Sequence, residues 1–287
     1  MKISIITPTY NRGDLIERAI QSILNQSHQN FEMLIIDDAS ADNTKMIVQK
    51  YTHDSRIKYH QCIENKGVSV ARNMGLSQIA SDSDLITFLD SDDEFMPTAL
   101  ADMISIMDEH AEISCFRFRV VDSSGKEASN PMHNNKVVDF DYFIKNLFNI
   151  GEWVCTYRRQ IIENGFRYNE NIRAFEVIAY IGLAKKEKQF FSDSIVRTYH
   201  IGHDSISNEK MSLTKIENSI QGYKFIVDEY GDDIFRVSKN IMARIEYILS
   251  YFYILKGQKK LGWYYNFRGF RKKPFDLRFV RNLLKTF

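Results

Sequence analysis

Residues 3–12 read ISIITPTYNR, and this stretch decides the fold. The run from Ile3 to Ile6 is typical of a buried β-strand, and the sequence turns polar directly after it. Behind it, apolar residues recur at helical spacing from Leu15 to Leu24. A buried strand followed by an amphipathic helix is the repeating unit of α/β proteins with a parallel sheet. We therefore expect this segment to form the first such unit.

The same alternation continues along the chain. Further strands are predicted at residues 31–36, 57–62, 85–89 and 113–121, and helices at 43–51, 68–79 and 97–107. Asp139 is expected to cap a later helix, and the chain beyond Ser207 is expected to be helical to about Leu255. The predicted fold class is α/β, with a mostly parallel central sheet flanked by helices and a helical C-terminal extension.

Polar residues follow the end of each of the first four predicted strands. These segments are residues 7–12, 37–40, 64–67 and 90–93. Ligands of open α/β sheets bind in the crevice beyond the carboxyl ends of the strands, so we expect the four segments to line one site. Two of them carry adjacent carboxylates, which repel one another unless a cation or hydrogen-bond donors lie between them.

The segment Asp90-Ser91-Asp92 is a candidate metal site. Two carboxylates two residues apart in a turn can face one point, and oxygen ligands of this kind suit Mg²⁺ or Mn²⁺ held together with substrate phosphates. The alternative is a solvated acidic turn that caps the helix near Pro97. The position directly after a buried strand favours the metal interpretation.

Asp38 and Arg72 are candidates for nucleotide contact. At a strand end, the Asp38 carboxylate could accept a hydrogen bond from a pyrimidine N–H, although Asp is also a common turn residue. Likewise, Asn65-Lys66-Gly67 could be a simple turn and Arg72 a surface cation. The sequence has neither Gly-x-Gly-x-x-Gly after its first strand nor Gly-Lys-Ser/Thr, which argues against a dinucleotide site and a P-loop.

Four motifs in order resemble one known family. They are ISIITPTYNR at 3–12, IIDDAS at 35–40, NKGVSVARNMG at 65–75 and TFLDSDD at 87–93. Together they resemble the signature of glycosyltransferase family 2. The resemblance is strong over residues 1–110, loose over 111–207 and hardly present beyond.

The resemblance implies a GT-A, Rossmann-like fold and an inverting transfer from a nucleoside-diphosphate sugar, usually UDP-linked, to a glycan or lipid-linked glycan, with Mn²⁺ or Mg²⁺ as cofactor. Residues 1–207 would form the glycosyltransferase domain, with a nucleotide-binding half at 1–110 and an acceptor half at 111–207, and residues 208–287 a helical C-terminal region. The donor-binding residues implied are Pro8, Thr9, Tyr10, Asp38, Asn65, Gly67, Arg72, Asp90 and Ser91, and the metal ligands Asp92 and His203.

The sequence departs from the family pattern where an acidic pair usually supplies the general base. Val177 stands in place of the second acid, so Glu176 is the predicted base. The alternatives are that Glu176 only favours the start of a helix, and that the chain is a catalytically impaired donor-binding relative. A sugar nucleotidyltransferase is a weaker alternative, because Pro8-Thr9-Tyr10-Asn11 is not a Gly-rich triphosphate loop.

Other residues are assigned from the same resemblance or from composition. His200 and His203 fall in a segment that resembles the family's closing loop, or are ordinary surface histidines. Trp153 and Tyr157 could stack on an acceptor sugar, but aromatic residues of this kind are usually core. The three cysteines have neither an even count nor CxxC spacing, and no export signal is recognisable, so a cytoplasmic location is expected.

The C-terminal tail is strongly basic. Residues 256–287 carry ten Lys or Arg and one acid, a net charge of +9, which leaves −8 for residues 1–255 of a chain with net charge +1. Basic residues interleaved with aromatic ones suit an anionic membrane surface, and we expect peripheral attachment to the inner face of the cell membrane. Nucleic-acid binding is not expected. The alternative is a pair of helices that packs on the acidic body.

Overall fold

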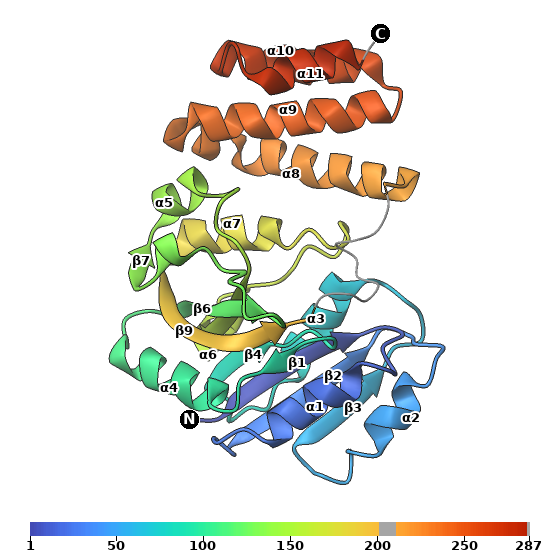
Figure 1. Cartoon of the computed structure of the whole chain (residues 1–287), viewed down its shortest axis with the longest axis vertical. Helices are drawn as coiled ribbons and strands as arrows, with labels where there is room; N and C mark the ends of the chain where they lie inside the picture. Colours follow the sequence, from blue (N-terminus) through green and yellow to red (C-terminus); the bar gives the residue numbers. More distant parts are fainter. Residues whose placement is uncertain (201–210, 286–287) are drawn as a thin grey trace.

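The computed structural model describes residues 1–200 and 211–285. A nine-stranded sheet occupies one end of the molecule, and a stack of helices occupies the other (Figure 1). The strand order is β3-β2-β1-β4-β8-β6-β9-β5, with β7 paired to β9. The predicted α/β class with a helical C-terminal extension is confirmed.

The first half of the sheet is parallel. Its strands are β1 (Ile3–Thr9), β2 (Phe31–Asp37), β3 (Ile57–Gln61) and β4 (Leu85–Phe88), and its helices are α1 (Ile16–Leu24), α2 (Thr44–Gln49) and α3 (Val68–Gln78). Side chains alternate between the two faces of a strand. Accordingly Ile3 and Ile5 join the core cluster that contains α1, whereas Ile6 joins the cluster that contains Ala71 of α3. Helices therefore cover both faces of this half.

The second half of the sheet reverses direction. Its strands are β8 (Trp153–Arg158), β6 (Cys115–Asp122), β9 (Gln189–Tyr199), β7 (Lys136–Val138) and β5 (Glu94–Phe95). Strand β8 runs antiparallel to β4 and to β6, while β9 runs parallel to β6. The start of β8 and the end of β9 consequently lie at the edge of the sheet where β4 ends.

Short helices cover this second half. They are α4 (Ala99–Glu109), the 3₁₀ helix η1 (Pro131–His133), α5 (Phe140–Lys145), α6 (Arg159–Glu163) and α7 (Val177–Lys186). The Asp139 side chain accepts a hydrogen bond from the Tyr142 N–H, which confirms it as the cap of α5. The helix expected to start at Pro97 begins at Ala99, behind Thr98.

Four helices form the C-terminal region. These are α8 (Leu213–Val237), α9 (Lys239–Leu255), α10 (Lys259–Lys272) and α11 (Leu277–Leu284), which follow one another away from the sheet (Figure 1). Helix α10 approaches α9 closely at Gly269, where an added Cβ would lie only 2.7 Å from the Tyr247 ring. None of the helices in the described residues is both long and apolar enough to cross a bilayer.

Burial decides between the two interpretations of Trp153 and Tyr157. Trp153 and Tyr157 are 5% and 0% exposed and belong to the core, so the idea that they stack on an acceptor is wrong. The Trp153 indole N–H donates to the Ile150 carbonyl oxygen at 2.7 Å. All three cysteines are free thiols.

Candidate functional site

The loops after β1 and β2 are joined at the carboxyl edge of the sheet. The Asn11 N–H donates to the Ser40 hydroxyl at 2.8 Å, and the Ala41 N–H donates to the Asn11 side-chain oxygen at 2.9 Å. Pro8 and Thr9 end β1 next to this junction, and the Tyr10 side chain is exposed. Among the described residues the buried Thr9 hydroxyl has no hydrogen-bond partner. A polar ligand at this edge would satisfy it.

Asp38 fixes the loop that leads into α3. Its two carboxylate oxygens accept hydrogen bonds from the Lys66 N–H at 2.8 Å and the Gly67 N–H at 2.6 Å. Gly67 has φ +95° and ψ 162°, a conformation that essentially only glycine adopts. The structure thus brings Asp38 together with Gly67, whereas the Asn65 side-chain oxygen accepts a hydrogen bond from Arg173. Each Asp38 oxygen retains a second lone pair for a ligand.

Arg72 joins two acids that are far apart in the sequence. From α3, its guanidinium donates to Asp90 at 3.0 Å and to Glu176 at 2.6 Å. Its carbon lies 5.4 Å from the centre of the Tyr168 ring and is in position for a cation–π contact. The predicted donor residues Arg72 and Asp90 and the predicted base Glu176 are therefore neighbours.

Arg197 of β9 extends this arrangement on the other side of Asp90. Its guanidinium nitrogens lie 3.6 Å from an Asp90 oxygen, 3.4 Å from Asp93 and 2.8 Å from Glu152. The result is a chain of alternating charge, Glu176–Arg72–Asp90–Arg197–Glu152, along the carboxyl edge; we call it the edge charge chain. Sequence reasoning missed Arg197 and Glu152, because only the reversed direction of β8 and the return of β9 bring them here.

Two acids of the turn after β4, the half-exposed Asp90 and the buried Asp93, differ in their ionisation. Burial raises the pKa of Asp90, but Arg72 and Arg197 outweigh burial and hold that pKa below its ordinary value. Burial raises the pKa of Asp93 to about 7, in spite of Arg197. Asp90 is therefore a fixed anion, whereas Asp93 changes its charge near neutral pH.

Asp92 and Ser91 occupy the middle of the same turn. The Ser91 side chain is buried, and an Asp92 oxygen lies 3.7 Å from the Arg12 Nε. In the described residues no three His, Cys, Asp or Glu side chains gather in a way that could hold a metal by themselves. Mg²⁺ and Mn²⁺ do not require such a cluster, because proteins commonly hold them through one or two carboxylates together with substrate phosphates. Asp92 is the residue here that could hold such an ion.

Glu176 stands directly before α7 and makes no capping hydrogen bond with its side chain in the described structure. Its carboxylate points instead to Arg72. Val177 begins the helix and packs against the apolar cluster that α7 shares with α8. His200 lies 2.9 Å from Glu94 through its Nε2. The other predicted histidine, His203, lies outside the described residues.

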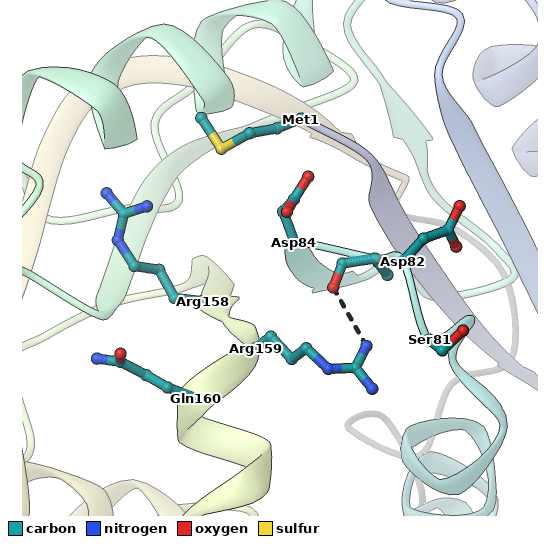
Figure 2. Close-up of a pocket in the computed structure, with 8 residues that line it drawn as sticks. Met1, Ser81, Asp82, Asp84, Arg158, Arg159 and Gln160 are labelled. Carbon is teal, nitrogen blue, oxygen red and sulfur yellow. Dashed lines mark hydrogen bonds between the residues drawn. The ribbon is translucent and has the colours of Figure 1, made fainter.

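Two cavities are lined by no member of the edge charge chain. One, of about 320 Å³, is lined by Met1, Asp84 and Arg159 among others, at the amino ends of β1 and β4. Figure 2 shows Arg159 at this cavity, where its guanidinium donates a hydrogen bond at 3.2 Å to the Ser83 carbonyl oxygen. The other, of about 680 Å³, lies between α3 and residues 167–171. The first is at the edge opposite the polar loops, so it is not the site described above.

Comparisons with known proteins agree with this fold. A family model described as "Glycosyl transferase family 2" matches residues 4–166, more than half of the chain. The GalNAc(5)-diNAcBac-PP-undecaprenol beta-1,3-glucosyltransferase of Campylobacter jejuni is 32% identical over 205 residues, which cover 70% of this chain and 65% of that protein. The putative teichuronic acid biosynthesis glycosyltransferase TuaG of Bacillus subtilis is 31% identical over 217 residues, 74% of this chain and 84% of that protein.

Solved structures give the same fold at lower sequence identity. TarS of S. aureus in complex with UDP-GlcNAc matches with a TM-score of 0.72 at 21% identity, over 100% of this chain and 88% of that chain. The mannosyltransferase PcManGT of Pyrobaculum calidifontis, in complex with GDP-Man and Mn²⁺, matches with a TM-score of 0.60 at 13% identity, over 99% of this chain and 86% of that chain.

The sheet and these likenesses define a glycosyltransferase with a GT-A type fold. More particularly, the chain belongs to glycosyl transferase family 2. The family and fold expected from the four sequence motifs are confirmed.

Proposed function

We propose that this chain is an inverting glycosyltransferase that moves a sugar from a UDP-linked donor to a hydroxyl of a glycan or lipid-linked glycan. The observation that carries the proposal is the edge charge chain. It puts the fixed anion Asp90, two buried arginines and the candidate base Glu176 beyond the carboxyl ends of parallel strands. Ligands of open α/β sheets bind at this edge.

The donor would lie across the loops after β1, β2 and β4. In this proposal Pro8, Thr9, Tyr10, Asp38, Asn65, Gly67 and Arg72 hold the base and ribose, and Asp90 and Ser91 lie near the ribose and phosphates. The unpartnered Thr9 hydroxyl and the free lone pairs of Asp38 support this placement. Asp92 would hold Mn²⁺ or Mg²⁺. When bound, the cation supplies charge neutralisation to the departing diphosphate.

Glu176 would act as the general base. The acceptor hydroxyl oxygen attacks the anomeric carbon, the bond from that carbon to the phosphate oxygen breaks, and the hydroxyl proton passes to the Glu176 carboxylate while UDP departs. A single displacement of this kind inverts the anomeric configuration. The contact with Arg72 at 2.6 Å supports the role, because it holds the carboxylate beside Asp90 and so beside the proposed phosphates.

The acceptor class comes from the relatives. The Campylobacter relative is named for an undecaprenol-linked glycan, and the Bacillus relative is named for the biosynthesis of teichuronic acid, a surface glycan. We therefore propose that this chain also extends a glycan of this class, at the cytoplasmic face of the membrane. No nucleic acid takes part in this proposal.

The experiment is a thermal-shift screen of UDP-, GDP- and dTDP-sugars, each with and without Mn²⁺. Ligands that bind only the native state raise its apparent stability. A UDP-sugar is expected to raise the unfolding midpoint in the presence of Mn²⁺ more than GDP- or dTDP-sugars do. If no nucleotide sugar shifts the midpoint, the proposal is wrong.

A second candidate function is donor binding without turnover, and Val177 is the observation that favours it. An apolar residue stands where a second acid would complete the acidic pair. Release of UDP from the donor that scores in the thermal-shift screen, with water or a glycan as acceptor, separates the two candidates. UDP binding without any release of UDP would favour the second.

A further inference from the structure

We propose that α10, α11 and the loop between them form a docking face for an anionic bilayer, with a defined set of apolar side chains that enters it. We call this set the tail face; its members are Leu261, Tyr264, Phe267, Phe275, Leu277, Val280 and Leu284. The sequence pattern indicated membrane attachment through the whole basic tail. We now assign the contact with the bilayer to one set of exposed side chains.

Burial divides the apolar residues of the tail into two groups. Tyr265 is buried and stacks on Tyr253 of α9 at 5.5 Å between ring centres, and Phe270 packs against Phe279 at 4.6 Å. These residues hold α10 and α11 on the bundle. The tail face is left outside, with Phe275 90% and Leu277 83% exposed. The exposed members on α10 and those on α11 each recur at a spacing of three or four residues, so each helix presents an apolar stripe, a feature typical of interaction sites.

The exposed charged side chains of residues 256–285 have one sign. Exposed cations accompany the tail face at Lys259, Lys260, Arg271, Arg281 and Lys285. The one acid of residues 256–285, Asp276, is buried and lies 3.0 Å from Arg278 and 3.5 Å from Lys273. In this described segment no exposed acid opposes the cations. Apolar insertion and attraction to anionic headgroups therefore act together.

The same observations disfavour two other occupants. A second copy of the chain placed on this face would bring like charges opposite one another. Single-stranded nucleic acid binds through bases stacked on aromatic rings, but Leu277, Val280 and Leu284 on α11 are aliphatic. A bilayer suits both groups of side chains.

Removal of the tail is a poor test of this face. Helix α10 covers Tyr247 of α9, and its Arg268 and Lys272 each lie 2.8 Å from Glu246, which is fully buried. A truncated chain would expose this interface and could lose its fold for that reason alone. Surface substitutions avoid the difficulty.

The experiment is co-sedimentation of the full chain with vesicles of phosphatidylcholine alone or mixed with phosphatidylglycerol, at low and high salt. The test variant is Phe275→Ser, Leu277→Ser, Leu284→Ser. The matched control replaces three exposed apolar residues elsewhere, Met46→Ser, Val137→Ser and Leu213→Ser, which are 58%, 51% and 62% exposed. A charge variant is Arg271→Glu, Arg281→Glu, Lys285→Glu. Unfolding midpoints confirm that each variant folds.

The wild type and the control are expected to bind the mixed vesicles, and the test and charge variants to bind at least about tenfold more weakly. High salt should weaken the wild type. Unchanged binding of the test variant, or equal binding to both vesicle types, would overturn the proposal, as would an oligomer or an oligonucleotide complex that forms in place of vesicle binding. The inference rests on the proposed function only in that a lipid-linked acceptor would place the enzyme at a membrane. UDP binding by the same variants distinguishes a failure of membrane docking from a failure of the proposed function.

Discussion

Asp90 and Glu246 are each held by two cations, but in different surroundings. Asp90 lies between Arg72 and Arg197 at the edge of the sheet, and Glu246 lies between Arg268 and Lys272 where α9 meets α10. The cations around Asp90 also contact Glu176, Glu152 and Asp93. Among the described residues, the cations around Glu246 form no ion pair with a second acid.

The difference separates a candidate site from a structural contact. At the sheet edge, each arginine keeps an acid if Asp90 is neutralised, so the arrangement can exchange one anion for another, such as a phosphate. In the bundle, Glu246 is fully buried and the two cations depend on it. We expect substitutions at the edge to change chemistry and substitutions at Glu246 to change stability.

The largest effect, on the rate of transfer, is expected at Glu176, which is bonded to Arg72 in the edge charge chain. Glu176→Gln keeps the size and hydrogen-bonding capacity of the side chain but removes its basicity. Transfer should fall by at least about a hundredfold, since a general base typically contributes 10²- to 10⁴-fold. Steady-state kinetics measure the turnover, and calorimetry should find the UDP affinity nearly unchanged. Transfer close to the wild-type rate would move the base to another group.

Asp90→Asn and Glu246→Gln test the comparison as a matched pair. Glu246→Gln should lower the free energy of unfolding by about 2 kcal/mol, less than for a fully buried ion pair because Arg268 and Lys272 reach solvent. Asp90→Asn should cost less stability and weaken UDP binding instead. Urea unfolding and UDP titration of both variants measure the two quantities. The reverse pattern would make Asp90 the structural residue.

The sequence predicted most of the parallel half and part of the site. Ile3–Ile6 and its polar continuation suffice for β1, because buried strands and their loops are encoded locally. Asp90 and Arg72 could be expected to meet, since both follow parallel strands that end at one edge. Arg197 could not be expected there, because its position depends on β9 pairing with β6, a contact between distant segments. For the same reason, the sequence alone could not decide whether Trp153 and Tyr157 are buried in the core or exposed to an acceptor.

The last expected effect is a change of stability with pH, and it comes from Asp93, the acid whose charge the sheet edge does not fix. The pKa of Asp93 is raised from 3.8 to about 7 in the folded chain. Between these values the native state binds a proton that the unfolded state has released, so stability falls as the pH rises towards 7. Asp93→Asn does not titrate. Urea unfolding in metal-free buffer should find that the stability of the variant relative to the wild type increases by about 2 kcal/mol between pH 5 and pH 8.

A constant difference between the two proteins across this pH range would contradict the raised pKa. Asp84→Asn is the control, because Asp84 lies at the opposite edge of the sheet and accepts a hydrogen bond from the Lys2 N–H. Its substitution should not reproduce the pH dependence of Asp93→Asn. A common pH dependence would point to the net charge of the protein instead.

The most direct test of the central claim is calorimetric titration of UDP into the wild type and into Asp92→Ala, with and without Mn²⁺. A diphosphate beside Asp90 and Asp92 needs a cation between like charges. Mn²⁺ is expected to strengthen UDP binding to the wild type and to have no such effect on Asp92→Ala, which should unfold at nearly the wild-type midpoint. Equal, metal-independent UDP binding by the two proteins would contradict the central claim.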